Sequence, residues 1–343
     1  MFYFDSDYLE GADERVLRAL VESNDEQTAG YGEDEYCQKA AALIRDMTKA
    51  PEAAVHFMIG GTQANLTVIA AALKPWEGVL CADTGHINVH ETGAIEATGH
   101  KVLALPGCVG KLSAEQVAEA LRSHREDSTH EHMVKPNLVY ISHPTEMGTL
   151  YTRPELEALS NLCRTNGLWL YLDGARLGYG LAAELSVDLP LLARCCDAFT
   201  IGGTKAGLLF GEAIVLTAIE LQDCFRYAMK QRGGMLAKGR LLGVQFETLL
   251  KDGYYLEACG RANSYAQRIK GAWLAMGFPL LCDTIANQVF PILPNGIIDR
   301  LRKKYSFAHW LQVDKSHAAV RFCASCTTRE EDVQTLINDI MAL

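Results

Sequence analysis

The feature that most constrains the fold is a series of short apolar runs, which alternate with segments of helical character. The runs cover residues 55–59, 79–81, 101–105, 138–142, 168–172, 198–201 and 213–216. This alternation is typical of α/β units around a mainly parallel sheet. Their continuous apolar character favours burial on both faces. Because ligands bind at the carboxyl ends of strands in such sheets, we expect the functional residues just after these runs.

The length of the chain predicts two domains. The chain has 343 residues, and a single core rarely extends beyond ~250 residues. We expect a three-layer α/β/α large domain with an N-terminal arm over residues 1–250, and a smaller α+β domain over residues 251–343. The pattern also predicts a linking helix at 235–250, strands at 286–293 and 318–322, and a closing helix at 330–343.

Net charge and composition indicate which kinds of molecule the chain can bind. The formal net charge of −10 argues against nucleic acid or an anionic membrane surface. No stretch approaches the ~20 apolar residues of a membrane helix, and the first residues lack the basic and apolar regions of a signal peptide. We therefore expect a cytoplasmic protein that acts on a small molecule and whose 11 cysteines are free thiols.

Two strand ends carry the residues that pyridoxal 5'-phosphate (PLP) chemistry requires. Lys205 follows the run at 198–201, and Asp173 follows the run at 168–172. A lysine amine forms a Schiff base with the PLP aldehyde, and an aspartate keeps the pyridinium nitrogen protonated. The plainer alternatives are a surface lysine in a turn and an aspartate that caps a helix.

Two further segments suit the same cofactor. Gly60, Gly61 and Thr62 lie between a strand and a helix, where backbone N–H groups and the helix dipole favour a phosphate. Arg176 lies three residues after Asp173 and could bind the phenolic oxygen of the cofactor, bind a carboxylate, or form a local ion pair.

His86 is the candidate proton acceptor. An imidazole can stack on a pyridine ring and also reach a substrate hydroxyl. A structural histidine is the plainer interpretation. The spacing of His86 and His90 is also compatible with zinc on one face of a helix, but no third ligand stands out, and we expect no metal.

Taken together, these motifs resemble the L-threonine aldolases of low specificity. These are fold type I PLP enzymes of the β-eliminating lyase superfamily, with the aspartate aminotransferase fold. The matching segments are Phe4-Asp5-Ser6-Asp7, Tyr31-Gly32-Glu33-Asp34, Gly61-Thr62-Gln63-Ala64-Asn65, His86 with Glu91 and Gly93, Thr145-Glu146 with Gly148-Thr149 and Tyr151, Asp173-Gly174-Ala175-Arg176, Gly202-Gly203-Thr204-Lys205 and Gly211-Glu212-Ala213. They keep the same order over residues 4–216, and the C-terminal third matches more loosely.

The resemblance implies a role for each matching residue. Lys205 would carry the cofactor, Asp173 would pair with its ring nitrogen, Gly61 and Thr62 would hold its phosphate, and His86 would stack on its ring. Ser6, Arg176 and Arg321 would bind the substrate carboxylate, for which the planar arginine fork is well suited. Tyr31 would line the pocket of its own or of a neighbouring subunit, and Arg232 and Lys238 resemble residues that reach a partner's site. The family implies a dimer or tetramer with a shared active site.

One departure concerns the loop after the run at 138–142. Many members have a histidine where this chain has Thr145 and Glu146. Glu146 could be a base, an orienter of His86, or a loop carboxylate, and His143 is a possible substitute.

The resemblance implies retro-aldol cleavage of L-threonine, L-allo-threonine or related β-hydroxy-α-amino acids to glycine and an aldehyde. The alternative is another fold type I reaction, β-elimination or racemisation of an amino acid. The same lysine, aspartate and phosphate loop would serve any of these reactions, since the cofactor carries the difficult chemistry.

Overall fold

A seven-stranded sheet forms the centre of the computed structural model, which describes residues 1–343. Its spatial order is β2-β8-β7-β6-β5-β3-β4. The strands are β2 (Ala54–Met58), β3 (Glu77–Ala82), β4 (Lys101–Leu105), β5 (Lys135–Ser142), β6 (Trp169–Asp173), β7 (Ala198–Gly202) and β8 (Glu212–Leu216). Each of the seven expected runs therefore contains a strand. Only β8 is reversed, since it pairs antiparallel with both β2 and β7.

Because β8 is reversed, its first residue lies at the edge of the sheet where the other strands end. Glu212, the first residue of β8, lies opposite Gly202 at the end of β7 and Met58 at the end of β2. The carboxyl ends of six strands and the amino end of β8 therefore share one edge of the sheet.

Helices cover both faces of this sheet. The α-helices of the whole chain, including those of the C-terminal elements described below, are α1 (Glu14–Glu22), α2 (Glu35–Thr48), α3 (Gly61–Ala72), α4 (His86–Val89), α5 (Ala114–Glu126), α6 (Arg153–Asn166), α7 (Leu177–Ala183), α8 (Leu189–Cys195), α9 (Ile219–Gln222), α10 (Phe225–Gln231), α11 (Arg240–Leu250), α12 (Tyr254–Ala275), α13 (Asn295–Leu301) and α14 (Glu330–Met341). None of them combines the length and the apolar character that crossing a bilayer requires.

Alternate residues along the strands belong to two separate apolar clusters. Val79 and Cys81 of β3 belong to the cluster that includes buried residues of α3 and α10, whereas Leu80 and Ala82 belong to the cluster that includes those of α2, α6, α8 and α11. This alternation follows from the two-residue period of a strand. It confirms the predicted three-layer α/β/α arrangement.

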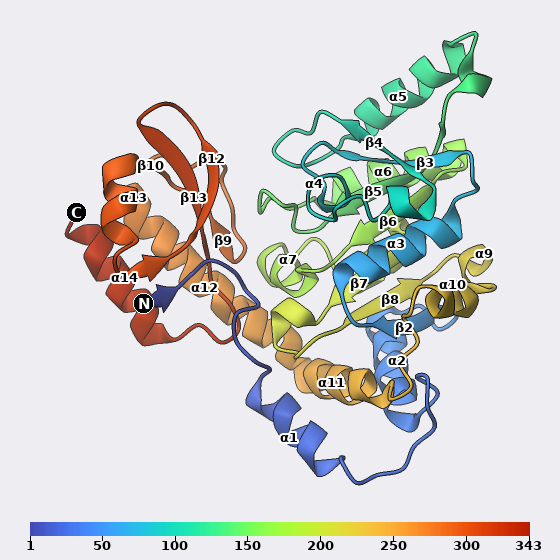
Figure 1. The fold of residues 1–343 in the computed structure, drawn as a ribbon, viewed down its shortest axis with the longest axis horizontal. Helices are drawn as coiled ribbons and strands as arrows, with labels where there is room; N and C mark the ends of the chain where they lie inside the picture. Colours follow the sequence, from blue (N-terminus) through green and yellow to red (C-terminus); the bar gives the residue numbers. More distant parts are fainter.

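The C-terminal elements form a group of their own beside the large sheet (Figure 1). There, β10 (Ile292–Pro294), β13 (His317–Cys323) and β12 (Ala308–Gln312) form an antiparallel sheet, and β9 (Gln288–Val289) also pairs with β13. The N-terminal strand β1 (Phe2–Tyr3) pairs with β11 (Tyr305–Ser306), so the arm crosses to this group. The predicted domain boundary at residue 250 coincides with the end of α11 and stays a prediction.

Two expected elements differ in the structure. The strand expected at 286–293 is divided into β9 and β10 around Phe290 and Pro291, because proline has no N–H to donate to a ladder. The helix expected at 235–250 begins only at Arg240. Residues 237–239 pack instead against residues 30–32, where a Cβ on Gly239 would lie 2.5 Å from the backbone nitrogen of Gly32.

Phe246 offers a test of how α11 is held on the edge strand. Its side chain is fully buried, and its ring centroid lies 5.1 Å from that of Phe57 on β2. Phe246→Ala should lower the free energy of unfolding in urea by about 3–5 kcal/mol, through lost apolar burial and a residual cavity. Leu185→Ala, at a side chain that is 88% exposed, is the control and should leave it nearly unchanged. A loss of equal size in both variants would contradict this packing.

Candidate active site

A cavity of about 290 Å³ lies at the shared edge of the sheet. The wall is formed by the N-terminal arm, the β2–α3 turn and the beginning of α3, α4, the end of β5 and the loop after it, the β6–α7 turn, the turn after β7, and the beginning of β8. The lining residues are Tyr8, Ile59, Gly60, Gly61, Thr62, Asn65, His86, Ser142, Pro144, Glu146, Asp173, Ala175, Arg176, Thr204, Lys205 and Glu212. The structure therefore brings seven of the predicted site residues to one cavity: Gly61, Thr62, His86, Glu146, Asp173, Arg176 and Lys205.

Asp173 is the buried carboxylate at the floor of this cavity. Its Oδ2 accepts hydrogen bonds from Tyr140 Oη at 2.7 Å and Asn65 Nδ2 at 2.9 Å, and its Oδ1 accepts one from the Ala175 N–H at 2.9 Å. Burial favours the neutral acid, but the charge of His86 and these hydrogen bonds outweigh it and lower the pKa of Asp173. The group is therefore an anion at neutral pH.

His86 is oriented by Glu91. The His86 Nδ1 lies 2.8 Å from Glu91 Oε1, and the same carboxylate oxygen accepts a hydrogen bond from Asn65 Nδ2 at 2.7 Å. Burial favours the neutral imidazole, but Glu91 and Asp173 outweigh it and raise the pKa of His86. Asn65 thus links the Glu91 carboxylate to the Asp173 carboxylate. The Asn65 Oδ1 accepts a hydrogen bond from Tyr171 Oη at 2.7 Å.

Lys205 lies beyond the end of β7 in a short 3-10 turn, Thr204–Ala206. Its Nζ is 5.9 Å from the ring centroid of Tyr8 in the N-terminal arm. The two glycines before the turn permit a close approach, since a Cβ on Gly202 would lie 2.3 Å from the Ala175 carbonyl oxygen. The lysine is thereby held beside the turn that follows Asp173.

The beginning of α3 is suited to a phosphate. Gly60 precedes α3, and no side chain caps the N-terminus of this helix. The first N–H groups of a helix have no hydrogen-bond partner within the helix. No atom lies within 4 Å of where a Cβ would stand on Gly60 or Gly61. The open backbone and the helix dipole therefore favour an anion here, with the Thr62 hydroxyl nearby.

Glu146 binds the backbone N–H of His86 rather than its ring. Its Oε1 accepts hydrogen bonds from the His86 N–H at 2.9 Å and from Ser142 Oγ at 2.6 Å. Burial raises the pKa of Glu146. Among the roles left open by the sequence, these contacts favour orientation of His86.

His143 lies outside the cavity. It is fully buried, its Nδ1 accepts a hydrogen bond from the Tyr151 N–H at 3.2 Å, and burial lowers its pKa to about 4. This neutral core histidine does not face the site that Glu146 lines.

Arg176 is paired inside the protein with Asp7, a contact that the sequence analysis did not foresee. Its Nε lies 2.7 Å from Asp7 Oδ2 and its Nη2 lies 2.9 Å from Asp7 Oδ1. Asp7 also accepts a hydrogen bond from Asn287 Nδ2 at 2.9 Å. Asp7 therefore joins the N-terminal arm to both groups of elements, and only the remaining N–H groups of Arg176 are available for a ligand.

Ser6 and Arg321 do not line the cavity. The Ser6 Oγ is buried without a partner, while Arg321 donates from Nη2 to the Asp5 carbonyl oxygen at 2.8 Å and from Nη1 to Gln288 Oε1 at 3.3 Å. The Arg321 Nε is also buried without a partner. Both residues lie where the arm meets the C-terminal sheet.

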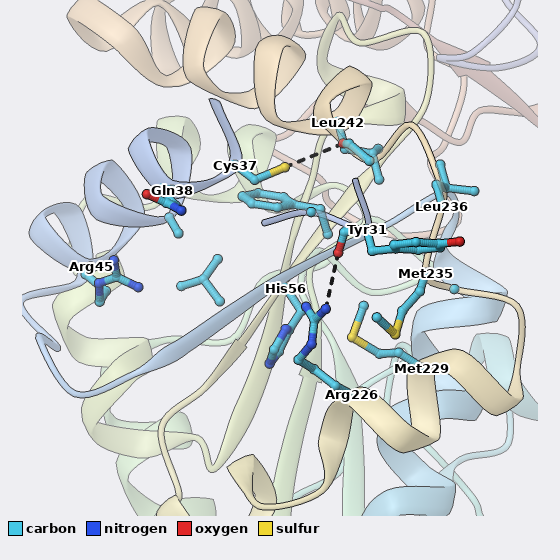
Figure 2. A pocket seen from close by; sticks show the side chains of 16 residues that line it. Tyr31, Cys37, Gln38, Arg45, His56, Arg226, Met229, Met235, Leu236 and Leu242 are labelled. Carbon is cyan, nitrogen blue, oxygen red and sulfur yellow. Dashed lines mark hydrogen bonds between the residues drawn. The ribbon is translucent and has the colours of Figure 1, made fainter. Parts of the chain in front are cut away.

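Tyr31 lies in a different cavity of this chain. Its neighbours there include His56, Arg226, Met235 and Leu236 (Figure 2), and its side chain is 46% exposed. The single chain therefore does not bring Tyr31 to the cavity that holds Lys205.

Several cavity residues received no role from sequence analysis, among them Tyr8, Asn65 and Glu212. Asn65 and Glu212 belong to segments that carried the family resemblance, which was the available signal for them. Tyr8 directly follows one of these segments.

Comparison with known proteins places the chain in a family. The model of the β-eliminating lyase family matches residues 4–296, so the chain belongs to this family. A low specificity L-threonine aldolase of a Pseudomonas species is 31% identical, over 99% of this chain and 97% of that protein.

The similarity extends to solved structures. A threonine aldolase from Leishmania major has a TM-score of 0.97 and 41% identity, and the match covers 100% of this chain and 99% of that one. An aspartate aminotransferase from Thermus thermophilus has a TM-score of 0.71 at 14% identity, over 100% of this chain and 91% of that one. The fold is thus the fold type I arrangement predicted from the sequence.

Family and fold are PLP-dependent, and the cavity residues fit this cofactor. An anionic Asp173, a lysine beside it and an uncapped helix N-terminus are complementary to the ring nitrogen, the aldehyde and the phosphate of PLP. The chain is therefore a PLP-type carbon–carbon lyase by family.

The pair of Asp7 and Arg176 gives a prediction for stability. Burial would raise the pKa of Asp7, but Arg176 outweighs it and lowers the pKa from 3.8 to about 2. A lowered folded pKa means that the stabilisation is present above pH ~4 and is lost as the pH falls toward ~2. Asp7→Asn should lower the free energy of unfolding at pH 7 by about 3–5 kcal/mol, because it leaves a buried guanidinium unpaired.

Urea unfolding across pH 3–8 checks this prediction. The difference between Asp7→Asn and the parent should stay constant from pH 5 to 8 and narrow below pH 4. The exposed Asp299, changed to Asn, is the control and should show little difference. An Asp7→Asn protein as stable as the parent at pH 7 would show that the pair does not hold the arm.

Proposed function

We propose that this chain binds PLP through Lys205 and cleaves L-threonine, L-allo-threonine or related β-hydroxy-α-amino acids to glycine and an aldehyde. The observation that carries the proposal is the hydrogen-bonded series Asp173–Asn65–Glu91–His86. Three of its members, Asp173, Asn65 and His86, line the same cavity as Lys205. The similarity to threonine aldolases from Pseudomonas and Leishmania major supports the same activity.

The cofactor residues have separate roles in this proposal. PLP, when bound, supplies the electron sink for breaking the bond between Cα and Cβ. Asp173 holds negative charge where the ring nitrogen would lie, Lys205 supplies the amine, and Gly61 and Thr62 at the beginning of α3 hold the phosphate. Because Asn65 and Tyr140 fix the Asp173 carboxylate, its charge is oriented before the cofactor binds.

His86 is the proposed acceptor of the β-hydroxyl proton. In the neutral form of His86, the Nδ1 proton is donated to Glu91, and Nε2 is free to accept a proton from the substrate. The raised pKa of His86, caused by Glu91 and Asp173 against the effect of burial, increases its proton affinity at neutral pH. Glu146 holds the backbone of this residue and thereby acts as a positioning residue.

The substrate carboxylate is assigned to Ser6, Arg176 and Arg321. Ser6 Oγ and Arg321 Nε are buried polar atoms without partners, and Arg176 keeps donors beyond the two that bind Asp7. These residues lie on or beside the N-terminal arm, so the arm would place the carboxylate next to the cofactor.

We also propose a homodimer, or a dimer of such dimers. Tyr31 is part-exposed and lies in another cavity of its own chain, so it can complete the site of a second copy rather than its own. Arg232 and Lys238 belong to the same region of the chain and are assigned to the same contact.

His86→Asn should lower kcat for aldehyde release by about 10²–10⁴-fold, which is the usual contribution of a positioned general base. The measurement is a coupled assay for acetaldehyde from threonine and allo-threonine, or benzaldehyde from phenylserine. His90→Asn is the matched control, since His90 is an exposed histidine four residues along the chain, and should keep the parent rate.

The same assay decides between reaction classes. Release of glycine together with an aldehyde supports the proposed cleavage. Pyruvate and ammonia from serine, with no aldehyde from any of the three substrates, would show a β-eliminating enzyme and would overturn it.

A further inference from the structure

Arg321, on β13, carries a guanidinium that the chain surrounds with neutral groups. Its Nη2 donates to the Asp5 carbonyl oxygen at 2.8 Å, and its Nη1 donates to Gln288 Oε1 at 3.3 Å. Its Cζ lies 5.3 Å from the ring centroid of Trp310. None of these groups carries a negative charge, and Arg321 forms no ion pair with a carboxylate of this chain. Because a guanidinium is always charged in proteins, this charge is left uncompensated.

The other arginine assigned to the substrate carboxylate, Arg176, differs in this respect. Both oxygens of the Asp7 carboxylate bind it, at 2.7 and 2.9 Å, so the charges of the two groups compensate each other. The Asp5 carboxylate does not do the same for Arg321, since it binds Ser306 Oγ at 2.5 Å instead. Arg321 is therefore the one of these two arginines whose charge an anionic ligand can still neutralise.

Gln288 stands where a carboxylate would neutralise Arg321. It begins β9 opposite Cys323 of β13, and it is fully buried. Because a guanidinium can only donate, the amide oxygen of Gln288 faces Arg321. A glutamate of nearly the same shape would replace this neutral hydrogen bond by a charge-assisted pair, which is the usual compensation of a buried charge. The chain therefore omits a negative charge at a position that could hold one.

Unused hydrogen-bond donors lie around the same guanidinium. Ser6 Oγ, Gln288 Nε2 and Arg321 Nε are all buried without a partner. Buried donors of this kind are rare in folded proteins and indicate a missing partner. An uncompensated cation beside unused donors is suited to a carboxylate, which only accepts hydrogen bonds.

This region adjoins the active-site cavity. Asn287, the residue before Gln288, donates from Nδ2 to Asp7 at 2.9 Å. Asp7 in turn binds Arg176, and Arg176 lines the cavity that holds Lys205. The adjacent residues Asn287 and Gln288 therefore each hold a group that borders the place assigned to the substrate.

We propose that Gln288 is a positioning residue that holds Arg321 without neutralising it, so that the charge of Arg321 stays available for the substrate carboxylate. This inference rests on the proposed function, which assigns that carboxylate to Ser6, Arg176 and Arg321. The amino acid supplies the negative charge that the chain omits, and no covalent bond forms or breaks in this step. The free chain is less stable than it would be with a glutamate at this position, and its affinity for the ligand is higher.

The test compares the binding of glycine and methylamine to the full chain loaded with PLP. The two ligands share an amine and differ by the carboxylate. Binding is followed through the absorbance of the cofactor, which gives a dissociation constant without turnover. Gln288→Glu should raise the dissociation constant of glycine by about 10–100-fold, because an internal carboxylate then competes for Arg321. It should leave the dissociation constant of methylamine unchanged.

Unfolding in urea separates this role from a purely structural one. The midpoint of Gln288→Glu should be no lower than that of the parent, since the new carboxylate pairs with Arg321. Weaker binding of both ligands together with a lower midpoint would show general damage to the fold and would overturn the proposal. Equal glycine constants in the parent and in Gln288→Glu would overturn it as well.

Gln334→Glu is the matched control. Gln334 Oε1 accepts a hydrogen bond from Arg268 Nη2 at 2.9 Å, so this substitution also places a carboxylate against an arginine. Gln334 lies on α14, which contributes no residue to the active-site cavity. The control should bind both ligands as the parent does.

Two further variants carry the test even if Gln288→Glu does not fold. Gln288→Met removes the amide without adding a charge and should keep the glycine constant within about fivefold, the size of one neutral hydrogen bond. Arg321→Gln removes the charge and should weaken glycine by about 10–100-fold without affecting methylamine. A loss in Gln288→Met as large as that in Arg321→Gln would show that the amide itself matters rather than its neutrality, and would overturn the proposal.

Failure of the proposed function would look different. A parent chain whose cofactor absorbance does not respond to glycine would refute the proposed function, and the role of Gln288 would fall with it. A parent that binds glycine, together with a Gln288→Glu variant that binds it equally well, would refute only the role of Gln288.

Discussion

The active site depends on how one buried negative charge, Asp173, is kept ionised. Hydrogen bonds from Asn65, Tyr140 and the Ala175 N–H, together with His86, compensate the cost of burial. These donors come from α3, β5 and the turn after β6, so the carboxylate is stable only when these elements are assembled. Through Asn65, the same network reaches Glu91 and fixes the imidazole that would accept the substrate proton.

A second requirement follows from the number of carboxyl groups around the cavity. Asp173 is anionic, while burial raises the pKa of Glu146 and of Glu212. One carboxyl therefore carries the charge that the proposed cofactor needs, while burial favours the neutral form of the two others. This division of roles among similar side chains comes from environment alone, since hydrogen-bond donors surround Asp173 and Glu212 has an unpartnered oxygen.

The sequence predicted those parts of the fold and site that depend on strand ends. The apolar runs located all seven strands, and Lys205, Asp173 and Thr62 could be placed because they follow such runs. Glu212 was missed because it begins its strand instead of following one, and a periodic pattern does not show that β8 is antiparallel. The pairing of Asp7 with Arg176 and the non-helical segment before Arg240 both come from contacts between residues far apart in the chain, which local pattern does not contain.

The central claim, that the cavity directs PLP to one lysine, can be tested by trapping the cofactor. The chain is incubated with PLP, reduced with borohydride, digested with trypsin, and searched for the pyridoxyl mass. The account predicts this mass on Lys205, in a peptide of residues 195–226, at one equivalent per chain. Modification spread over several exposed lysines, with Lys205 unmodified, would contradict it.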